Sequence, residues 1–437
     1  MNQAPPNSDV LVLGAGLAGI SAALALGGGY RLVERESRPG GLCRTDIRDG
    51  FAFDATGHWL HLRDPDARAL AHEVLPGGWL TVQRRAAIRS HGVFTRYPYQ
   101  VNTSGLPPAV AAENVLGFVA AQLGEAGAEL RQRVPRNFEE YVLRHLGAGF
   151  ARNFMFPYNE KLWTVPPAEL TIEWMGRFVP RPTLEQVVRG ALGLEGDAEG
   201  YNATFLYPRE GGIETFVRAL VARLPRTPEC GVHPVSIDPI RKVARLSTGE
   251  EVRYRAVIST APLPDMVDLV GGAPAAVREA SRLLRAATVT YVNVAARDVG
   301  APSWHWTYLP EPGFRAYRVG SASAAVSSLA PPGFRSFYVE LSGRQPVPPA
   351  EAGRAALDAL LSLGMIESPE DVKFAEVRTI PQAYVIHDFV YGSARAAVRE
   401  WLGERDILVA GRSGSWEYSS MEDALLGGRQ AARLLKR

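Results

Sequence analysis

The chain has 437 residues, of which 46% are hydrophobic, and its 48 basic and 46 acidic side chains give a formal net charge of +2. This length favours two or three domains over a single core, and the nearly balanced charge argues against binding to nucleic acid or to an anionic membrane surface. The two cysteines cannot form a disulfide framework and fit a reducing cytoplasm. The sequence contains no run of 18 apolar residues, so we expect no membrane-inserted helix.

The chain begins with a strand–turn–helix–strand pattern that is typical of dinucleotide-binding domains. Val10–Leu13 suits a strand buried on both faces, Ile20–Leu26 a helix, and Tyr30–Val33 the next strand. The turn carries the pattern G-x-G-x-x-G at Gly14, Gly16 and Gly19. These glycines permit a tight turn, close approach of a pyrophosphate, and close packing of helix on strand. Glu34 follows where a carboxylate accepts hydrogen bonds from ribose, so we expect a dinucleotide site; the alternative is a purely structural turn.

A second glycine pair and a Gly-His sequence follow the first unit. Gly40 and Gly41 come shortly after the acidic residue, and the segment 50–58 ends in Gly57 and His58. Together with the first motif, this pattern resembles the two-part fingerprint of FAD enzymes of the amine oxidase, protoporphyrinogen oxidase and UDP-galactopyranose mutase group. The resemblance implies that FAD is the cofactor. The cofactor-binding residues that it implies are Gly14, Gly16, Leu17, Ala18, Gly19, Glu34, Arg35, Gly40, Gly41, Leu42, Thr56, Gly57, His58, Val235, Gly411, Arg412 and Met421.

Two features near this fingerprint have other interpretations. Cys43 lies close to the expected cofactor, but a small buried packing residue is the favoured interpretation. His58 and His61 are three residues apart, yet no further ligand pair accompanies them, so no metal site is predicted.

Further along the chain, helical and strand patterns separate into blocks. The predicted helices are Asp66–Val74, Ala109–Gln122, Asn137–Leu146, Leu184–Leu192, Glu214–Leu224, Pro349–Leu363 and Met421–Lys436. The predicted strands are two short ones within Arg84–Arg96, then Val232–Ile237, Val243–Leu246, Tyr254–Thr260, Thr288–Ala296, Trp306–Leu309, Tyr317–Val319, Arg335–Leu341 and Ile407–Arg412. The expected fold class is α/β. It combines a discontinuous FAD-binding domain of the two-dinucleotide-binding Rossmann type (1–62, 203–275 and 404–437), a helical substrate-binding insertion (105–202) and an antiparallel-sheet substrate domain (63–104 and 276–403).

Several segments outside the fingerprint resemble the eukaryotic-type UDP-galactopyranose mutases. The segment 156–166 is similar to that family's Pro-Tyr-Asn…Trp segment, and 97–100 is similar to its mobile loop. Further matching segments are Asn202–Phe205, Tyr308–Glu311, Tyr317–Arg318, Tyr384 and Gly411–Tyr418. The resemblance implies conversion of a nucleoside-diphosphate sugar between its pyranose and furanose forms. N5 of reduced FAD would be the nucleophile at the anomeric carbon, with NADPH or NADH as a candidate reductant.

The same resemblance implies roles for individual residues. The implied catalytic residues are His58, Tyr308, Arg318, Tyr384, Arg412 and Tyr418, and the implied substrate-binding residues are Tyr97, Gln100, Tyr158, Asn159, Trp163, Arg177, Asn202 and Tyr317. A guanidinium group can bind a diphosphate through two parallel hydrogen bonds, tyrosine hydroxyls can donate to the same oxygens, and tryptophan can stack on a base.

Each of these residues also has a structural interpretation. Trp163 alone would be a core or loop-anchoring residue, Arg318 alone a solvated strand residue, and each tyrosine a packing residue. The sequence also departs from the mutase pattern, because strict spacing places Phe178 where the family has its second diphosphate arginine; Arg177 and Arg181 are the nearest substitutes. The sugar, the base and the oligomeric state stay open. The rival functions are an FAD-dependent oxidoreductase of the amine oxidase or protoporphyrinogen oxidase type and a non-catalytic flavin or nucleotide binder.

Overall fold

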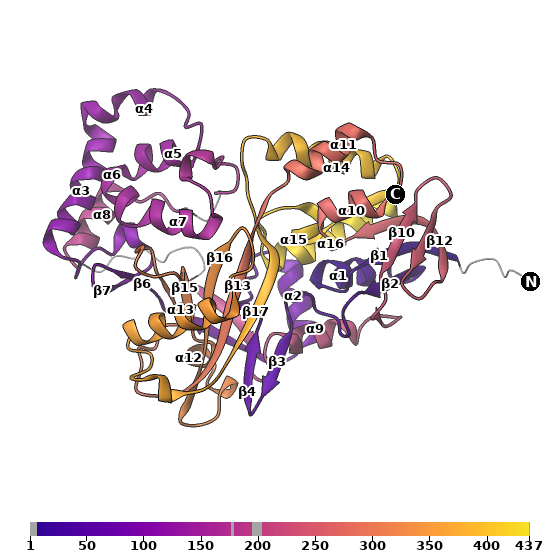
Figure 1. The fold of residues 1–437 in the computed structure, drawn as a ribbon, viewed down its shortest axis with the longest axis horizontal. Helices are drawn as coiled ribbons and strands as arrows, with labels where there is room; N and C mark the ends of the chain where they lie inside the picture. Colours follow the sequence, from indigo (N-terminus) through magenta and orange to yellow (C-terminus); the bar gives the residue numbers. More distant parts are fainter. Residues whose placement is uncertain (1–6, 176–178, 195–202, 437) are drawn as a thin grey trace, which may run out of the picture.

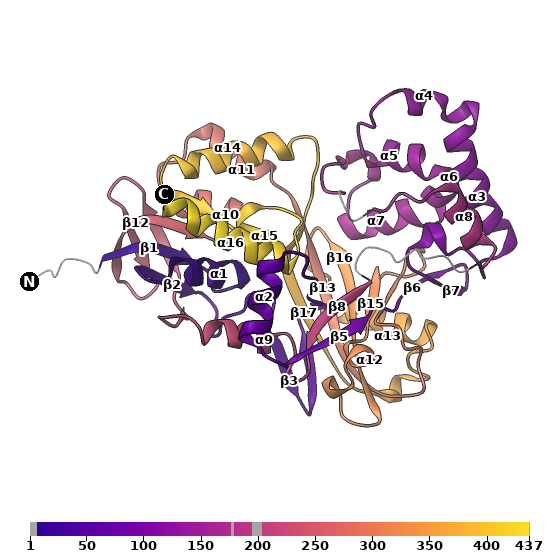
Figure 2. The same ribbon diagram turned by 180° about the vertical axis from the view of Figure 1, so that it is seen from behind.

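The computed structural model describes residues 7–175, 179–194 and 203–436. Within these ranges the molecule has three parts: a largely parallel sheet covered by helices, an antiparallel sheet, and a helical unit (Figure 1). The antiparallel sheet lies between the other two parts, as the view from behind also shows (Figure 2). The predicted α/β fold class is confirmed.

The first sheet contains the unit predicted at the start of the chain, which folds as β1 (Asn7–Leu13), α1 (Leu17–Leu26) and β2 (Tyr30–Glu34). Its strand order is β10-β11-β12-β1-β2-β9, and β18 pairs with β12. The other strands are β9 (Glu229–Cys230), β10 (Pro234–Asp238), β11 (Val243–Leu246), β12 (Glu251–Ser259) and β18 (Ile407–Val409). Because β1 is parallel to β2 and β12, and β12 is parallel to β18, their carboxyl ends meet at one edge, which is where open α/β sheets bind ligands.

Helices cover both faces of this sheet because successive residues of a strand point to opposite sides. Val10 and Val12 belong to one hydrophobic cluster, whereas Leu11 and Leu13 belong to another. The first cluster includes α1, α2 (Pro65–Val74), α9 (Glu214–Val221) and α16 (Met421–Leu435), and the second includes α10 (Leu263–Leu269), α11 (Ala275–Leu283) and α14 (Tyr391–Gly403). Helices α11 and α14 thus share a core with β1 and β12, although they lie in the range 276–403 that the sequence predicts for the antiparallel-sheet domain.

The second sheet is antiparallel apart from one parallel pair, β14 with β6, and has the order β17-β13-β16-β15-β14-β6-β7. Its strands are β6 (Ala86–Ser90), β7 (Val93–Arg96), β13 (Ala286–Arg297), β14 (Trp306–Tyr308), β15 (Arg318–Gly320), β16 (Phe334–Gly343) and β17 (Val372–Val385). Helix α13 (Pro349–Ser362) packs on one face, together with Phe337, Val339 and Leu341 of β16. The alternate residues of β16 therefore face the other side of the sheet, toward the first sheet.

Two small pairs of strands and several short helices complete this part of the molecule. The strand pairs are β3 (Thr45–Arg48) with β4 (Phe51–Asp54), and β5 (Trp79–Gln83) with β8 (Thr204–Pro208). The short elements are α12 (Ala322–Ala325), α15 (Gly411–Ser415) and 3₁₀ turns at Tyr99–Val101, Glu125–Gly127, Pro167–Glu169, Ser327–Leu329 and Pro369–Asp371.

The helical unit consists of α3 (Pro108–Leu123), α4 (Ala128–Gln132), α5 (Phe138–His145), α6 (Gly147–Phe150), a π-helical turn (Ala151–Met155), α7 (Phe156–Trp163) and α8 (Leu184–Ala191). Its core is rich in aromatic side chains and continues into the second sheet through Val289 and Tyr317. Helix α7 lies at this junction, because its residues pack both in the helical core and against the sheet.

The predicted helices and strands are confirmed within a few residues of their ends. The sequence did not predict β17, α10, α11 or α14. Strand β17 has an irregular pattern of exposed and partly buried residues, so it lacks the apolar alternation that marks a half-buried strand.

Candidate functional site

A cavity of about 1110 Å³ lies between the two sheets. One wall is formed by the carboxyl ends of the first sheet and the glycine turns, and the opposite wall by β13, β16 and β17. Its volume slightly exceeds the usual range for small-molecule sites, which is about 300–1,000 Å³. The cavity is therefore large enough for a long ligand such as a dinucleotide.

The glycine turn between β1 and α1 requires glycine at its first position. Gly14 has φ +92°, and a Cβ atom there would lie 2.3 Å from Oγ1 of Thr260. The second glycine pair lies against this turn, since Gly40 N donates to Ala15 O at 2.8 Å and a Cβ on Gly41 would lie 3.3 Å from Gly16 Cα. The result is a backbone cradle at the N-terminus of α1, where amide groups and the helix dipole favour a phosphate group. These residues fit the pyrophosphate of a dinucleotide.

Glu34 lies at the end of β2 and lines the cavity. Its side chain is fixed by two backbone donors: Ala15 N at 2.7 Å from Oε2 and Glu36 N at 2.9 Å from Oε1. A carboxylate has about four acceptor positions, so each oxygen retains capacity for a ligand hydroxyl. This geometry suits the predicted contact with ribose.

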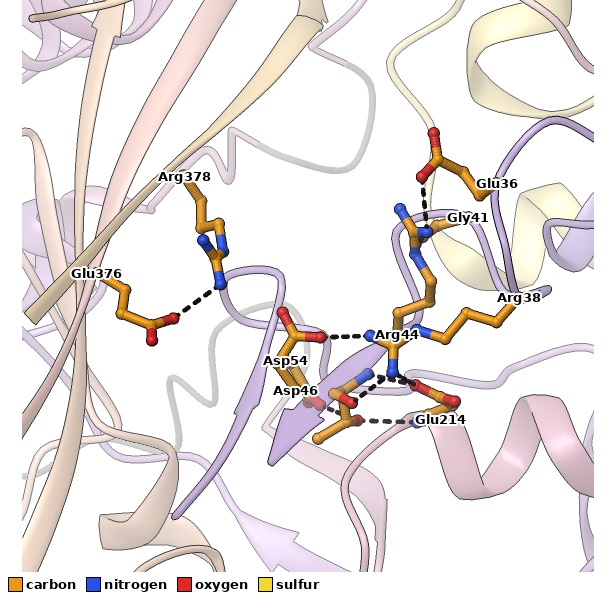
Figure 3. Close-up of polar contacts among 10 residues, drawn as sticks. Glu36, Arg38, Gly41, Arg44, Asp46, Asp54, Glu214, Glu376 and Arg378 are labelled. Atoms are coloured by element: carbon orange, nitrogen blue, oxygen red, sulfur yellow. Dashed lines mark hydrogen bonds and ion pairs between the residues drawn. The ribbon is translucent and has the colours of Figure 1, made fainter. Parts of the chain in front are cut away.

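The edge of the cavity beside the second glycine pair carries charged side chains that are already paired (Figure 3). Arg44 lines the cavity, donates to Gly41 O at 2.8 Å and pairs with Glu36 at 3.2 Å. Arg38 pairs with Asp46 and lies 3.5 Å from Glu214. These contacts hold the second glycine pair and the start of β3 against α9.

His58, the last residue of the Gly-His sequence and a predicted cofactor-binding residue, lines the cavity. Burial, together with the positive charge of Arg412, lowers the pKa of His58 to about 4. At neutral pH the imidazole is therefore uncharged, and it presents either a donor or an acceptor at each ring nitrogen according to its tautomer.

Arg318 and Arg412 both line the cavity, but their charges are balanced differently. Arg318 forms a bidentate pair with Glu340, with Nε 2.7 Å from Oε2 and Nη2 2.9 Å from Oε1. The guanidinium of Arg412 donates to the backbone carbonyls of Ala383 and Ser419, at distances of 2.7–3.1 Å. In the described ranges no carboxylate forms an ion pair with Arg412. Arg412 thus keeps its positive charge available to an anionic ligand.

Three tyrosines form one side of the cavity near these arginines: Tyr317, Tyr384 and Tyr418. The Arg412 guanidinium lies 5.2 Å from the ring centre of Tyr384 and 5.1 Å from that of Tyr418, distances at which cation–π attraction operates. Burial raises the pKa of Tyr317 and of Tyr418, so both phenols are protonated donors at neutral pH.

Five predicted substrate residues and one predicted catalytic residue lie behind the cavity wall. Trp163 is fully buried, donates to Oδ1 of Asn159 at 3.2 Å, and packs on Tyr384 and Tyr418 with ring centres 5.7 and 5.3 Å apart. Tyr158 packs on Tyr308 at 5.2 Å and on Tyr317 at 6.3 Å. The predicted residues outside the cavity lining are Tyr97, Gln100, Tyr158, Asn159, Trp163 and Tyr308. Of these, Tyr158 and Trp163 pack directly on tyrosines of the cavity wall, whereas Gln100 donates to Pro180 O at 2.9 Å.

The remaining predicted residues divide as follows. The cofactor residues Gly16, Leu17, Ala18, Arg35, Gly40, Gly41, Leu42, Thr56, Gly57, Gly411 and Met421 line the cavity. Gly19 lies outside the lining, where a Cβ would be 1.8 Å from Gly14 O, as expected for close helix–strand packing. Val235 is also outside it and is 50% exposed. Arg177 and Asn202 lie outside the described residues.

The structure adds lining residues that sequence reasoning missed, notably Trp59, Trp306, Tyr338, Glu340 and 379–383 of β17. The most informative is Glu340, which has a side chain of 0% exposure. A glutamate inside the apolar run of the predicted strand 335–341 was the available signal, because a buried carboxylate requires a partner. The residues of β17 gave no such signal, since that strand itself was not predicted.

The described residues contain no cluster of three or more His, Cys, Asp or Glu side chains arranged to hold a metal ion. They also contain no helix with the length and apolar character needed to cross a membrane.

The flavin-containing amine oxidoreductase family model matches residues 17–436. The chain belongs to this family. The fit of the glycine cradle and Glu34 to a dinucleotide agrees with this assignment, and the protein is an FAD-dependent flavoenzyme. In this flavoenzyme Gly14, Gly16, Gly41 and Glu34 are the residues that would hold the dinucleotide part of FAD.

Solved structures resemble this flavoenzyme along nearly its whole length. A reduced UDP-galactopyranose mutase superposes with a TM-score of 0.88 at 25% identity, covering 98% of this chain and 93% of the mutase. A putative protoporphyrinogen oxidase from Exiguobacterium sp. 255-15 gives 0.74 at 15% identity, covering 98% of both chains. Cyclohexylamine oxidase from Brevibacterium oxydans gives 0.66 at 17% identity, covering 98% of this chain and 99% of the oxidase. The two oxidases share the fold alone.

A short segment of the chain is similar in sequence to a curated protein. The inactive all-trans-retinol 13,14-reductase of Danio rerio is 41% identical over 62 residues, which is 14% of this chain and 10% of that protein. The match spans only a tenth of that relative's length, so it bears on a local segment and not on the activity of the whole protein.

Proposed function

We propose that this flavoenzyme interconverts the pyranose and furanose forms of a nucleoside-diphosphate sugar. The observation that carries the proposal is the similarity to a reduced UDP-galactopyranose mutase, with a TM-score of 0.88 over 98% of the chain, which exceeds that of the oxidases named above. Bound and reduced, FAD would supply the electron-rich nitrogen that attacks the anomeric carbon, and NADPH or NADH is the proposed source of its electrons.

The charges of the cavity support a substrate with an anionic leaving group. Arg412 offers an uncompensated guanidinium, and Arg318 adds N–H donors that its pairing with Glu340 does not consume. The tyrosine hydroxyls supply neutral donors beside them. We assign the diphosphate to Arg318 and Arg412, and the sugar to the space bounded by Tyr317, Tyr384 and Tyr418.

Each of the four carboxylates that line the cavity in the described ranges has a partner. Glu340 is engaged by Arg318, Glu34 is held by backbone amides near the glycine cradle, Glu36 pairs with Arg44, and Asp265 accepts a hydrogen bond from Gln382 at 3.5 Å. Neutral His58 can hold a hydrogen bond at the flavin without adding charge. These side chains bind and orient the substrate, and they exclude water while the diphosphate departs and returns.

The test is an anaerobic assay of the dithionite-reduced holoprotein with a panel of nucleoside-diphosphate pyranoses, with products separated by chromatography. We expect conversion to an isomer of equal mass, with no net consumption of reductant and no activity in the oxidised enzyme. If turnover instead requires stoichiometric oxygen or another electron acceptor, the protein is an oxidoreductase of the amine oxidase type and the proposal fails.

A further inference from the structure

Lys161 lies on α7, between Asn159 and Trp163, and its side chain reaches the loop that follows β14. Its ammonium group donates to the carbonyl oxygens of Leu309 at 2.9 Å, Glu311, and Ala316 at 3.5 Å. An ammonium group has three donors, and here all three are directed to one short stretch of backbone.

That stretch is the connection between β14 and β15, residues 309–317. It begins directly after Tyr308 and ends at Tyr317 and Arg318, which line the cavity. Leu309 N donates to Tyr317 O at 2.9 Å, and Tyr317 N donates to Glu340 O at 3.0 Å. The shape of the connection therefore helps to determine the positions of Tyr317 and Arg318.

Lys161 ties this connection to a different part of the molecule. The connection belongs to the antiparallel sheet, whereas α7 belongs to the helical unit. Leu309 and Ala316 are both 0% exposed, so their carbonyls have little access to water and depend on protein donors. Hydrogen bonds from a charged donor are stronger than neutral ones, which makes this a firm attachment.

We propose that Lys161 is a positioning residue: its ammonium group holds the β14–β15 connection in the shape that presents Tyr317 and Arg318 to the ligand. The proposal deepens the proposed function, on which its assignment of Arg318 to the diphosphate rests. Lys161 itself does not line the cavity. Burial lowers the pKa of Lys161 to about 8, with the negative charge of Glu311 opposing that shift and the positive charge of Arg315 adding to it, so the group is largely protonated at pH 7.

The first experiment compares hydrogen exchange in three holoproteins without substrate: wild type, Lys161→Met and Lys161→Arg. We expect Lys161→Met to lose protection at 309–318 while the rest of the second sheet keeps it, and Lys161→Arg to recover part of that protection because it retains a cation. Lys161→Gln, which keeps two N–H donors without charge, serves if Lys161→Met does not fold, and the same local loss is expected. Unchanged protection at 309–318 in the neutral variant overturns the proposal.

The second experiment measures the affinity of the same proteins for uridine diphosphate, with FAD content measured in parallel. We expect the neutral variant to bind about tenfold more weakly, with the arginine variant between it and wild type and FAD content unchanged. The matched control is Lys242→Met, because Lys242 also donates to a backbone carbonyl, that of Arg405 at 2.7 Å, and pairs with Asp406, but neither partner is next to a residue that lines the cavity. If Lys242→Met and Lys161→Met lose the same affinity for uridine diphosphate, the loss does not depend on the β14–β15 connection, and the proposal is overturned.

The two experiments separate this inference from the proposed function. If wild type neither binds uridine diphosphate nor isomerises a nucleoside-diphosphate sugar, the proposed function fails, and the exchange data alone decide whether Lys161 holds the connection. If wild type is an active mutase and the neutral variant keeps its affinity, its kcat and its KM, the proposed function stands and Lys161 has no positioning role.

Discussion

Arg318 and Glu340 lie directly opposite each other on the neighbouring strands β15 and β16, and their side chains join in a bidentate ion pair at the cavity wall. The Glu340 side chain is 0% exposed and that of Arg318 is 21% exposed. Burial alone would lower the pKa of Arg318, but the carboxylate of Glu340 raises it well above its ordinary value. The pair thus fixes the plane of the guanidinium and cancels most of its charge.

Removing Glu340 should be costly because it leaves a largely buried guanidinium without a counter-ion. We expect Glu340→Ala to lower the free energy of unfolding by about 3–5 kcal/mol, measured by urea denaturation with FAD bound. The double variant Glu340→Leu with Arg318→Met should recover part of this loss. Glu279→Ala, which removes an exposed pair with Arg282, is the control and should cost less than about 1 kcal/mol. Equal costs for the two glutamates would show that the Arg318–Glu340 pair behaves as a surface pair.

The different pairing of the two arginines predicts which one dominates anion binding. In the described structure the hydrogen bonds of Arg412 go to backbone carbonyls and no carboxylate pairs with it, whereas Arg318 is neutralised by Glu340. We expect Arg412→Gln to weaken binding of a nucleoside diphosphate more than Arg318→Gln does, by about tenfold or more in Kd. Isothermal titration on protein with full FAD content gives both values, and Arg412→Lys should lie between wild type and Arg412→Gln. The reverse order would assign the diphosphate mainly to Arg318.

The glycine cradle predicts that Gly14 and Gly28 differ sharply in how they tolerate a methyl group. Gly14→Ala would place a Cβ 2.3 Å from Oγ1 of Thr260 at a φ of +92°, so the turn must shift away from the pyrophosphate position. Gly28→Ala adds a Cβ that meets nothing within 4 Å. We expect purified Gly14→Ala to contain little FAD, as judged by the ratio of flavin to protein absorbance, and Gly28→Ala to match wild type. Full flavin content in Gly14→Ala would show that FAD does not bind at this turn.

The cofactor side could be predicted from the sequence because its residues are close together along the chain. Gly14, Gly16 and Glu34 form a local pattern whose spacing alone defines the strand, turn and helix around a pyrophosphate. The partnership of Arg318 with Glu340 could not be predicted in this way, since it depends on the register of two strands that are 22 residues apart in sequence. The sequence likewise predicts a role for Trp163, but it does not show whether its side chain forms the surface of the cavity or packs behind the residues that do.

Trp163 provides a test of that distinction. Its side chain is fully buried and packs on Trp174, Tyr384 and Tyr418. We expect Trp163→Ala to lower the free energy of unfolding of ligand-free holoprotein by about 3–5 kcal/mol, because it leaves a cavity in the aromatic core. Leu123→Ala, at a side chain that is 70% exposed, should change stability by less than about 0.5 kcal/mol. Full stability of Trp163→Ala combined with a lost nucleotide affinity would instead make Trp163 a base-stacking surface.

The buried histidines predict how stability depends on pH. Burial lowers the pKa of His58, His305 and His387 to about 4 from an ordinary value of 6.5. Between these two values the unfolded chain binds protons that the folded chain does not, so stability falls as the pH drops from about 6.5 toward 4. His387 is 6% exposed, and neither of its ring nitrogens has a hydrogen-bond partner in the described structure. We therefore expect His387→Leu to reduce the loss of Tm between pH 7.5 and pH 5, measured by differential scanning calorimetry, whereas the exposed His72→Leu should leave that loss unchanged.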